Sequence, residues 1–223
     1  MGNIIAIDGP AGAGKSTIAR ALAERLGFTY IDTGAMYRTV ALASLRAGLS
    51  LEDEDAVARL ARNSSIEFVP VGRIFLNGED VSPLIRTPEV TSAASKVAAM
   101  PSVRAILVEK QRRIGQTGNV VMEGRDIGTV VFPHARVKIF LDADPIERVR
   151  RRGGDLPNVP LEQLAREIRE RDERDSQRAQ SPLVQAADAV RLDSTRLTTS
   201  EVLDAILELV RSRISLERAH GEG

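Results

Sequence analysis

The most chemically informative stretch of the sequence is residues 3–16, NIIAIDGPAGAGKS, where an apolar run ends at Asp8 and a glycine-rich turn follows. The spacing Gly-x4-Gly-Lys-Ser that starts at Gly9 is the phosphate-binding loop pattern. Its glycines permit positive φ, so successive backbone N–H groups can converge on an anion. Lys15 then supplies charge for the β and γ phosphates, and the Ser16 hydroxyl can reach a bridging Mg²⁺. The residues predicted to bind the nucleoside triphosphate are Gly9, Pro10, Ala11, Gly12, Ala13, Gly14, Lys15, Ser16 and Thr17.

A strand before this loop and a helix after it would hold it in place. Residues 17–26 carry Ile18, Leu22 and Leu26 at helical spacing, so a helix begins at the loop and points its N-terminal dipole at the phosphates. A short glycine motif can also match by chance. The strand-turn-helix context argues against chance, and the sequence therefore predicts a protein that binds a nucleoside triphosphate.

Composition limits the remaining functions. The chain has 223 residues and 43% apolar residues, enough for one substantial core with a small appended subdomain. Lys plus Arg and Asp plus Glu both number 31, and aromatic residues make up 3%, which argues against nucleic-acid binding by bulk charge or base stacking. The chain has no cysteine, which excludes disulfides and thiolate chemistry. No apolar run approaches the ~18 residues of a membrane span. We expect a cytoplasmic monomer whose partners are small-molecule nucleotides, with no nucleic-acid or membrane partner.

Five short β-branched or apolar runs alternate with helical patterns along the chain. Such alternation is typical of an α/β fold with a parallel sheet and helices on both faces. The sequence therefore predicts a five-stranded, parallel, doubly wound sheet. The predicted strands are residues 3–8, 28–31, 119–122, 137–141 and 189–192.

Polar residues follow the ends of these strands, where ligands bind in open α/β sheets. They are Asp8, Asp32, residues 123–126 and Asp142. An aspartate at a strand end is often only a helix N-cap, and Asp142 and Asp144 fit that alternative equally well. Arg125 and Asp126 form an adjacent pair of opposite charges, for which capping would not need both members. We therefore expect this pair to contact a ligand.

Residues 64–104 interrupt the alternation between the second and third strands. Residues 66–69 and 73–76 indicate a β-hairpin, Asn77-Gly78 indicates a second turn, and helices are expected at about 88–99 and 101–113. We interpret residues 64–104 as a subdomain inserted into a core formed by residues 1–63 and 105–223. It either contacts the ligand or only covers a sheet edge.

Two arginine-rich segments follow the fourth strand. Arg148, Arg150, Arg151 and Arg152 run into Gly153-Gly154, which suggests a short mobile lid over a phosphate chain at about residues 148–162. The alternative is a solvated helix end whose arginines complement the dipole.

Farther along, Arg171, Asp175 and Arg178 are spaced i, i+4, i+7. On one helix face, these two guanidiniums would flank a carboxylate and could hold a phosphate and a sugar hydroxyl. The alternative for this segment is ordinary surface ion pairs.

Seven blocks of sequence now carry a family resemblance. IDGPAGAGKSTIA, IDTGAMYR, AASKVAAMPSVR, EGRDIGTVVFP, VKIFLDA, RERDERDSQRA and LDST occur in this order across nearly the whole chain. Together they resemble the bacterial cytidylate kinases, which are P-loop nucleoside monophosphate kinases with an enlarged nucleotide-binding insertion. The resemblance implies a P-loop kinase fold, and transfer of phosphate from ATP to CMP or dCMP with Mg²⁺, in pyrimidine nucleotide metabolism.

The resemblance also implies a role for each matching residue. Ser95, Arg104 and Asp126 would contact cytosine, Arg171 and Asp175 the ribose, and Arg38, Arg125 and Arg178 the acceptor phosphate, with the Thr33 hydroxyl where a Ser may also stand. Mg²⁺ would bind Ser16 directly and Glu123 through water, although an Asp is expected at position 123. The predicted catalytic residues are Lys15, Arg125, Arg151 and Arg178.

Base selection and catalysis both have a physical reason in this picture. The Asp126 carboxylate can accept from the exocyclic amino group of cytosine, whereas uracil would present an oxygen to it, which predicts discrimination against UMP. The acceptor phosphate is already anionic, so no general base is required, and catalysis is positioning plus charge neutralisation.

Two other functions stay open. A P-loop kinase of another acceptor, such as a different nucleoside monophosphate or shikimate, would share the phosphate loop and lid. A GTPase-type switch would need a guanine-reading Asn-Lys-x-Asp element, and the sequence has no Asn-Lys pair. Measuring which acceptors stimulate ATP turnover distinguishes both of these alternatives from a cytidylate kinase.

Overall fold

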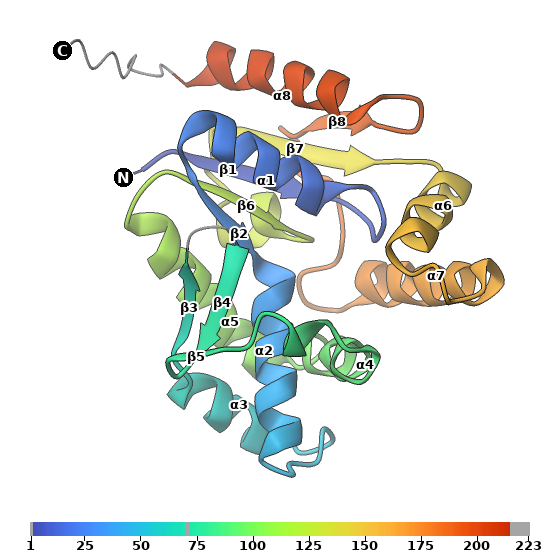
Figure 1. The fold of residues 1–223 in the computed structure, drawn as a ribbon. Coiled ribbons are helices and arrows are strands. Elements are labelled where there is room, and N and C mark those ends of the chain that lie inside the picture. The colour runs from blue at the N-terminus through green and yellow to red at the C-terminus, as the bar shows by residue number, and fades with distance from the viewer. Residues whose placement is uncertain (1, 70–71, 215–223) are drawn as a thin grey trace.

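The computed structural model describes residues 2–69 and 72–214. Its centre is a five-stranded sheet in the order β2-β6-β1-β7-β8, in which every neighbouring pair is parallel (Figure 1). The predicted parallel sheet is therefore confirmed. The strands are β1 (Ile4–Asp8), β2 (Thr29–Asp32), β6 (Val120–Gly124), β7 (Val137–Asp142) and β8 (Val190–Asp193).

Helices cover both faces of this sheet, as the doubly wound prediction requires. On one face, α1 (Lys15–Leu26) and α8 (Thr199–Arg213) pack on β1 and β7 in one apolar cluster. On the other face, α5 (Pro101–Gln116) and the short π-helical turn η3 (Ile127–Val131) pack on β2 and β6. The helix α8 begins with a capping box formed by Thr198 and Glu201, which satisfies N–H groups that the first turn leaves without a partner.

The remaining elements before α5 form a second apolar cluster below the sheet (Figure 1). The predicted hairpin is present in a three-stranded antiparallel sheet in the order β3-β4-β5. Because this cluster runs from Ala35 to Leu107, α2 and α3 pack together with residues 64–104. The extent of the inserted subdomain stays a prediction. The elements are α2 (Thr33–Arg46), α3 (Glu54–Asn63), β3 (Ile66–Val69), β4 (Arg73–Leu76), β5 (Glu79–Asp80), η2 (Leu84–Arg86) and α4 (Pro88–Val97).

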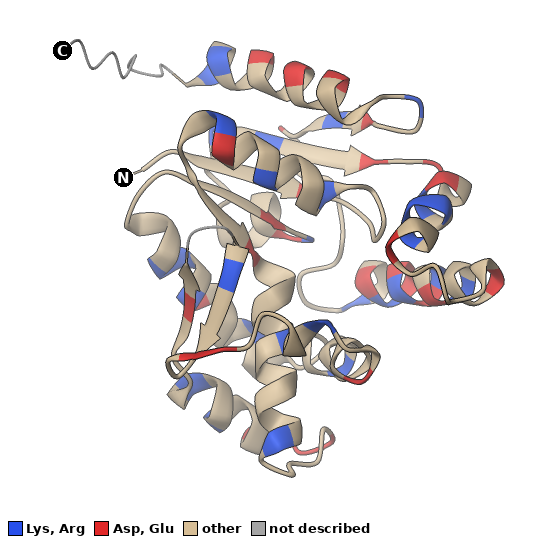
Figure 2. Cartoon of the chain, in the orientation of Figure 1, with Lys and Arg blue, Asp and Glu red and all other residues tan. Residues whose placement is uncertain are grey.

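Two helices, α6 (Pro145–Asp155) and α7 (Leu161–Gln177), pack on each other beside the phosphate loop, and α7 carries closely interspersed basic and acidic residues (Figure 2). The expectation that Gly153 and Gly154 form a loop was wrong, because α6 continues through both. The reason is packing: a Cβ on Gly153 would lie 2.7 Å from the Leu161 side chain, so the glycine lets α7 approach α6.

Asp142 and Asp144, which the sequence analysis considered as helix caps, have different hydrogen-bond partners. The side chain of Asp144 accepts a hydrogen bond from the Ile146 N–H and caps α6. Asp142 instead accepts from Arg191 on the neighbouring strand β8, at 2.8 Å. Among residues 2–69 and 72–214, no helix combines the length and the apolar character needed to cross a bilayer.

Candidate active site

The phosphate loop lies between β1 and α1 and has the predicted backbone. Gly9, Gly12 and Gly14 all have positive φ, at 149°, 77° and 88°. At Gly9 a Cβ would also lie 1.9 Å from the carbonyl oxygen of Leu141, so only glycine fits where β1 passes the end of β7. The helix α1 begins at Lys15, within the loop as predicted, and no side chain caps it. Its first N–H groups are therefore available to an anion.

Lys15 is buried, and its Nζ donates to the Pro10 carbonyl oxygen at 2.6 Å. Burial first, and then the positive charge of Arg125, lower the pKa of Lys15 to about 7, while Glu123 opposes this shift. A negatively charged phosphate placed beside Lys15 would favour its protonated form. Lys15 is thus suited to hold an anion inside the loop.

Glu123 is buried at the end of β6, and Asp32 occupies the partner position on β2. Tyr30 donates its hydroxyl to Glu123 Oε1 at 2.5 Å, and Thr33 Oγ1 donates to the Glu123 carbonyl oxygen at 2.7 Å. Burial and the neighbouring Asp32 raise the pKa of Glu123, and Lys15 lowers it. Tyr30 was missed by the sequence analysis, because no motif marks a partner that comes from a different strand.

A cavity of about 160 Å³ lies beyond the carboxyl end of β6, between α2, α4, α5 and α7. All nine residues predicted to bind the acceptor line it: Thr33, Arg38, Ser95, Arg104, Arg125, Asp126, Arg171, Asp175 and Arg178. The fold therefore brings the predicted set together, while their individual roles stay predictions. The lining residues that were not predicted are Gly34, Tyr37, Thr91, Ala94, Ala98, Ala99, Gly124 and Arg174.

Positive charge dominates this cavity, whose lining contains six arginines and two aspartates. Arg125 Nε donates to Asp175 Oδ2 at 2.8 Å, and the guanidiniums of Arg178 and Arg171 lie 3.8 and 4.0 Å from the same carboxylate. Burial and the neighbouring Arg125 lower the pKa of Arg171 to about 10. One carboxylate cannot neutralise three arginines, so the cavity suits a multiply charged anion.

Several buried donors in this cavity have no hydrogen-bond partner among the described residues. They are Nε of Arg38, Nε of Arg104, Nε and NH2 of Arg178, and the hydroxyl of Tyr37. Buried donors of this kind are costly unless a partner satisfies them. Their convergence in one cavity points to a ligand rich in acceptor oxygens.

Arg104 and Asp126 form the second charged pair of the cavity. Arg104 NH2 donates to Asp126 Oδ2 at 2.5 Å, and both side chains are buried. NH1 of Arg104 donates to the Ala98 carbonyl oxygen at 3.2 Å, and the guanidinium lies 5.5 Å from the centre of the Tyr37 ring. A guanidinium and a carboxylate held side by side can present donors and an acceptor to one edge of a ligand.

The arrangement of Arg171, Asp175 and Arg178 differs from the predicted helix face. The helix α7 ends at Gln177, and Arg178 has extended backbone angles of −58° and 132°. Placing Arg178 on the helix was therefore wrong. Its guanidinium still reaches Asp175 and the cavity, because the chain turns there toward Leu183, whose N–H donates to the Asp175 carbonyl oxygen.

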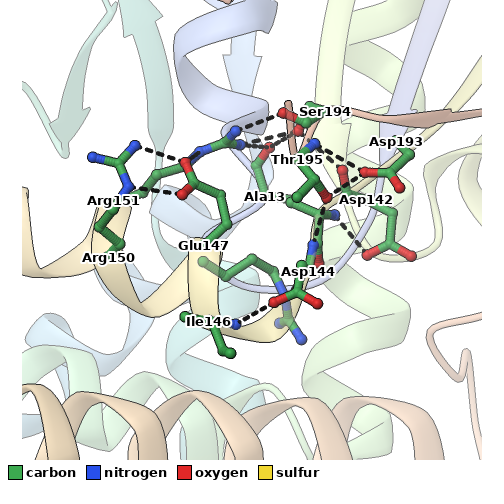
Figure 3. Close-up of polar contacts among 12 residues, drawn as sticks. Ala13, Asp142, Asp144, Ile146, Glu147, Arg150, Arg151, Asp193, Ser194 and Thr195 are labelled. Carbon is green, nitrogen blue, oxygen red and sulfur yellow. Dashed lines mark hydrogen bonds and ion pairs between the residues drawn. The ribbon is translucent and has the colours of Figure 1, made fainter. Parts of the chain in front are cut away.

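Arg151 lies beside Ala13 of the phosphate loop, together with Glu147 and Ser194 (Figure 3). Its Nε donates to Glu147 at 2.8 Å, NH1 donates to Ser194 Oγ at 3.0 Å, and NH2 donates to the Ser194 carbonyl oxygen at 2.7 Å. NH1 also lies 3.4 Å from the Ala13 carbonyl oxygen. Arg151 is thus held against the loop and does not line the acceptor cavity, so its catalytic role stays a prediction. The buried Ser194, from the block LDST, was not predicted.

Arg148 is buried, although the sequence analysis placed it in a mobile lid. Its NH1 donates to the Ala11 carbonyl oxygen at 3.1 Å and forms an ion pair with Asp172 of α7. Asp172 Oδ1 in turn accepts from the Ala11 N–H at 3.2 Å. This pair joins both α6 and α7 to the phosphate loop.

Replacing Arg148 by alanine is therefore expected to lower the free energy of unfolding by about 3 kcal/mol, since it leaves Asp172 largely buried without its charged partner. Urea unfolding followed by circular dichroism measures this. The matched control is Arg150→Ala on the same helix, where the side chain is 72% exposed and a change within about 0.5 kcal/mol is expected. Equal unfolding midpoints for the two variants would contradict the structural role of Arg148.

Comparison with known proteins places this geometry in a family. The sequence profile of the family described as cytidylate kinase matches residues 5–212. A cytidylate kinase from Solibacter usitatus is 60% identical over 218 residues, covering 95% of this chain and 94% of that protein. A cytidylate kinase from Caldanaerobacter subterraneus is 52% identical over 211 residues, covering 93% and 94%. A crystal structure of a Thermus thermophilus protein shares the fold, with a TM-score of 0.50 at 23% identity over 96% and 98% of the two chains. The phosphate loop and the arginine-lined cavity follow the neighbouring strands β1 and β6, and with these sequence matches this chain belongs to the cytidylate kinase family.

Proposed function

We propose that this protein transfers the terminal phosphate of ATP to CMP or dCMP, giving ADP and CDP or dCDP. The observation that carries the proposal is the acceptor cavity itself, with the buried Arg104–Asp126 pair for a base and five further arginines for a phosphate. Arg125 and Arg171 line this cavity and lie close enough to Lys15 to lower its pKa. The donor and acceptor phosphates would therefore meet between Lys15 and Arg125.

The reaction follows from positioning and charge. In-line transfer spreads negative charge over the transferred group, and fixed cations stabilise that charge. Lys15 would act on the donor phosphates, and Arg125 and Arg178 would act on the acceptor phosphate. The acceptor is already anionic, so the residues have to hold it in line and exclude water, and none has to remove a proton.

Mg²⁺ fits the residues present beside the loop. Ser16 lies in the first turn of α1 and is exposed, and its hydroxyl is close enough to Glu123 to act against the rise in the pKa of that carboxyl. A hydroxyl and a carboxylate are the hard oxygen ligands that Mg²⁺ prefers, together with water and phosphate oxygens. We propose that Ser16 holds Mg²⁺ directly and Glu123 holds it through water. When bound, Mg²⁺ supplies positive charge to the β and γ phosphates.

The inserted residues 64–104 are proposed to form the acceptor-binding subdomain. They contribute Thr91 and Ser95 of α4 and Arg104 of α5 to the lining of the cavity. Ser95 and Arg104 are also the positions that the family resemblance assigns to cytosine. If the insertion only covered a sheet edge, its side chains would not be expected to line the cavity.

One assay tests the proposed reaction: ADP release by purified protein with ATP and Mg²⁺, offered CMP, dCMP, UMP, AMP or shikimate in turn. CMP and dCMP are expected to stimulate release, and UMP to do so with at least about tenfold lower kcat/KM. Excess EDTA should abolish turnover, and isothermal titration should show ATP binding that weakens without Mg²⁺. Equal rates with every acceptor, or release that no acceptor stimulates, would refute the proposal.

A further inference from the structure

Asp8 is a buried carboxylate that none of the predicted binding roles uses. It is the last residue of β1, 5% exposed, and directly precedes Gly9 of the phosphate loop. Its Oδ1 accepts a hydrogen bond from the Ile127 N–H at 2.8 Å, and its Oδ2 accepts one from the Gly128 N–H at 2.7 Å. Both carboxylate oxygens are thus engaged by the backbone of another segment.

The segment from Gly124 to Ile127 is attached to Asp8 at both of its ends. In the sheet, Asp8 pairs with Gly124, the last residue of β6. The chain then leaves the sheet for Arg125 and Asp126 only, before it returns to the Asp8 side chain at Ile127. A two-residue excursion with both ends attached to one residue has little conformational freedom. Arg125 and Asp126 both line the acceptor cavity.

Local capping does not explain this attachment. Ile127 and Gly128 supply the first N–H groups of η3, which lack partners within the turn. Asp126, the residue before the turn, makes no side-chain cap, and its carboxylate binds Arg104 instead. Asp8 therefore satisfies, from β1, the first two N–H groups of η3. The Asp126 side chain is left to face the cavity.

We propose that Asp8 is a positioning residue for acceptor selection, a role that rests on the proposed function. By holding the Ile127 and Gly128 amides, it sets where Asp126 presents its carboxylate to the base. A carboxylate is required because two parallel N–H groups need two acceptors, and asparagine would turn its own NH2 toward one of them. The fold keeps this carboxylate although burial raises its pKa to about 6.

The variant Asp8→Asn tests the proposal through the ratio of kcat/KM for CMP to kcat/KM for UMP. Both values come from the same preparation, so partial loss of folded enzyme cancels in the ratio. The ratio is expected to fall about tenfold, with KM for CMP rising more than KM for ATP. A purely structural role would lower both rates by the same factor, and an unchanged ratio would overturn the proposal.

A matched control and a double variant make the test specific. Asp188→Asn makes the same exchange at a carboxylate outside the cavity, which accepts two hydrogen bonds from the Lys138 ammonium, and its ratio should equal that of the wild type. If Asp8 acts through Asp126, adding Asp8→Asn to Asp126→Ala should not lower the ratio further. Independent, multiplied effects of the two changes would contradict the proposed route.

Two further outcomes are distinguishable. Should Asp8→Asn yield too little active protein, the same ratio is measured for Asp8→Glu, which keeps both oxygens but displaces them by one methylene; a wild-type ratio there rejects the proposal. If the wild type itself shows no preference for CMP over UMP, the proposed selectivity fails. A selective wild type with an equally selective Asp8→Asn variant rejects only the role of Asp8.

Discussion

Replacing Lys15 by alanine is expected to lower kcat with CMP by about 10²–10³-fold, the loss typical of removing one fixed group that stabilises transition-state charge. Lys15 is the only lysine of the phosphate loop, and the loop holds its ammonium through the Pro10 carbonyl oxygen. The measurement is initial-rate ADP release at saturating ATP and CMP. An unchanged kcat would remove Lys15 from the phosphate-binding role.

The fold should survive this substitution. Burial lowers the pKa of Lys15 to about 7, which means that the ligand-free fold disfavours its charge. Alanine removes that buried charge, so the thermal unfolding midpoint is not expected to fall. Lys96→Ala serves as the control, because Lys96 is exposed in α4, pairs with the exposed Glu52 and should leave kcat unchanged. A Lys15→Ala variant that unfolds at a much lower temperature would make its lost activity uninformative about phosphate binding and contradict this expectation.

Replacing Asp126 by alanine is expected to reduce the preference for CMP over UMP by at least about tenfold. The carboxylate is the buried acceptor of the cavity that can bind an exocyclic amino group, and its loss also leaves the Arg104 guanidinium without its charged partner. Rates with CMP should fall and rates with UMP should change less, because uracil gains nothing from the carboxylate. The ratio of the two kcat/KM values, measured on one preparation, is the readout.

The control for this prediction is Asp126→Asn, which keeps the shape and one oxygen acceptor while removing the charge. It should retain more of the preference than alanine does. If the wild type and Asp126→Ala discriminate equally between CMP and UMP, Asp126 has no part in base selection. Arg104 and Ser95, which also line the cavity, would then be the next residues to test.

The phosphate loop and the sheet could be predicted from the sequence, because their determinants are local. Positive φ at Gly12 and Gly14 follows from the absence of a Cβ, and the capping box at Thr198 is complete within four residues. Each buried strand is recognisable in the sequence as a short apolar run, and its backbone groups form their hydrogen bonds with neighbouring strands of the sheet. Parallel strands also place their carboxyl ends at one edge, which is why residues from distant blocks line the same cavity.

The partner of each buried polar group was not predictable in the same way. The continuation of α6 through Gly153 depends on how closely α7 packs against it. Arg148 is buried because Asp172 and Ala11, from two other segments, both bind its guanidinium. Asp8 looked like an ordinary strand-end aspartate, although its oxygens bind amides about 120 residues farther along the chain. The residues of this protein thus determine by their own conformational preferences where a phosphate can bind, whereas the crossing of distant elements decides which charges are buried, paired or left for the ligand. The physical reason is that a backbone angle depends on a few neighbouring residues, while the cost of burying a charge depends on everything that packs around it.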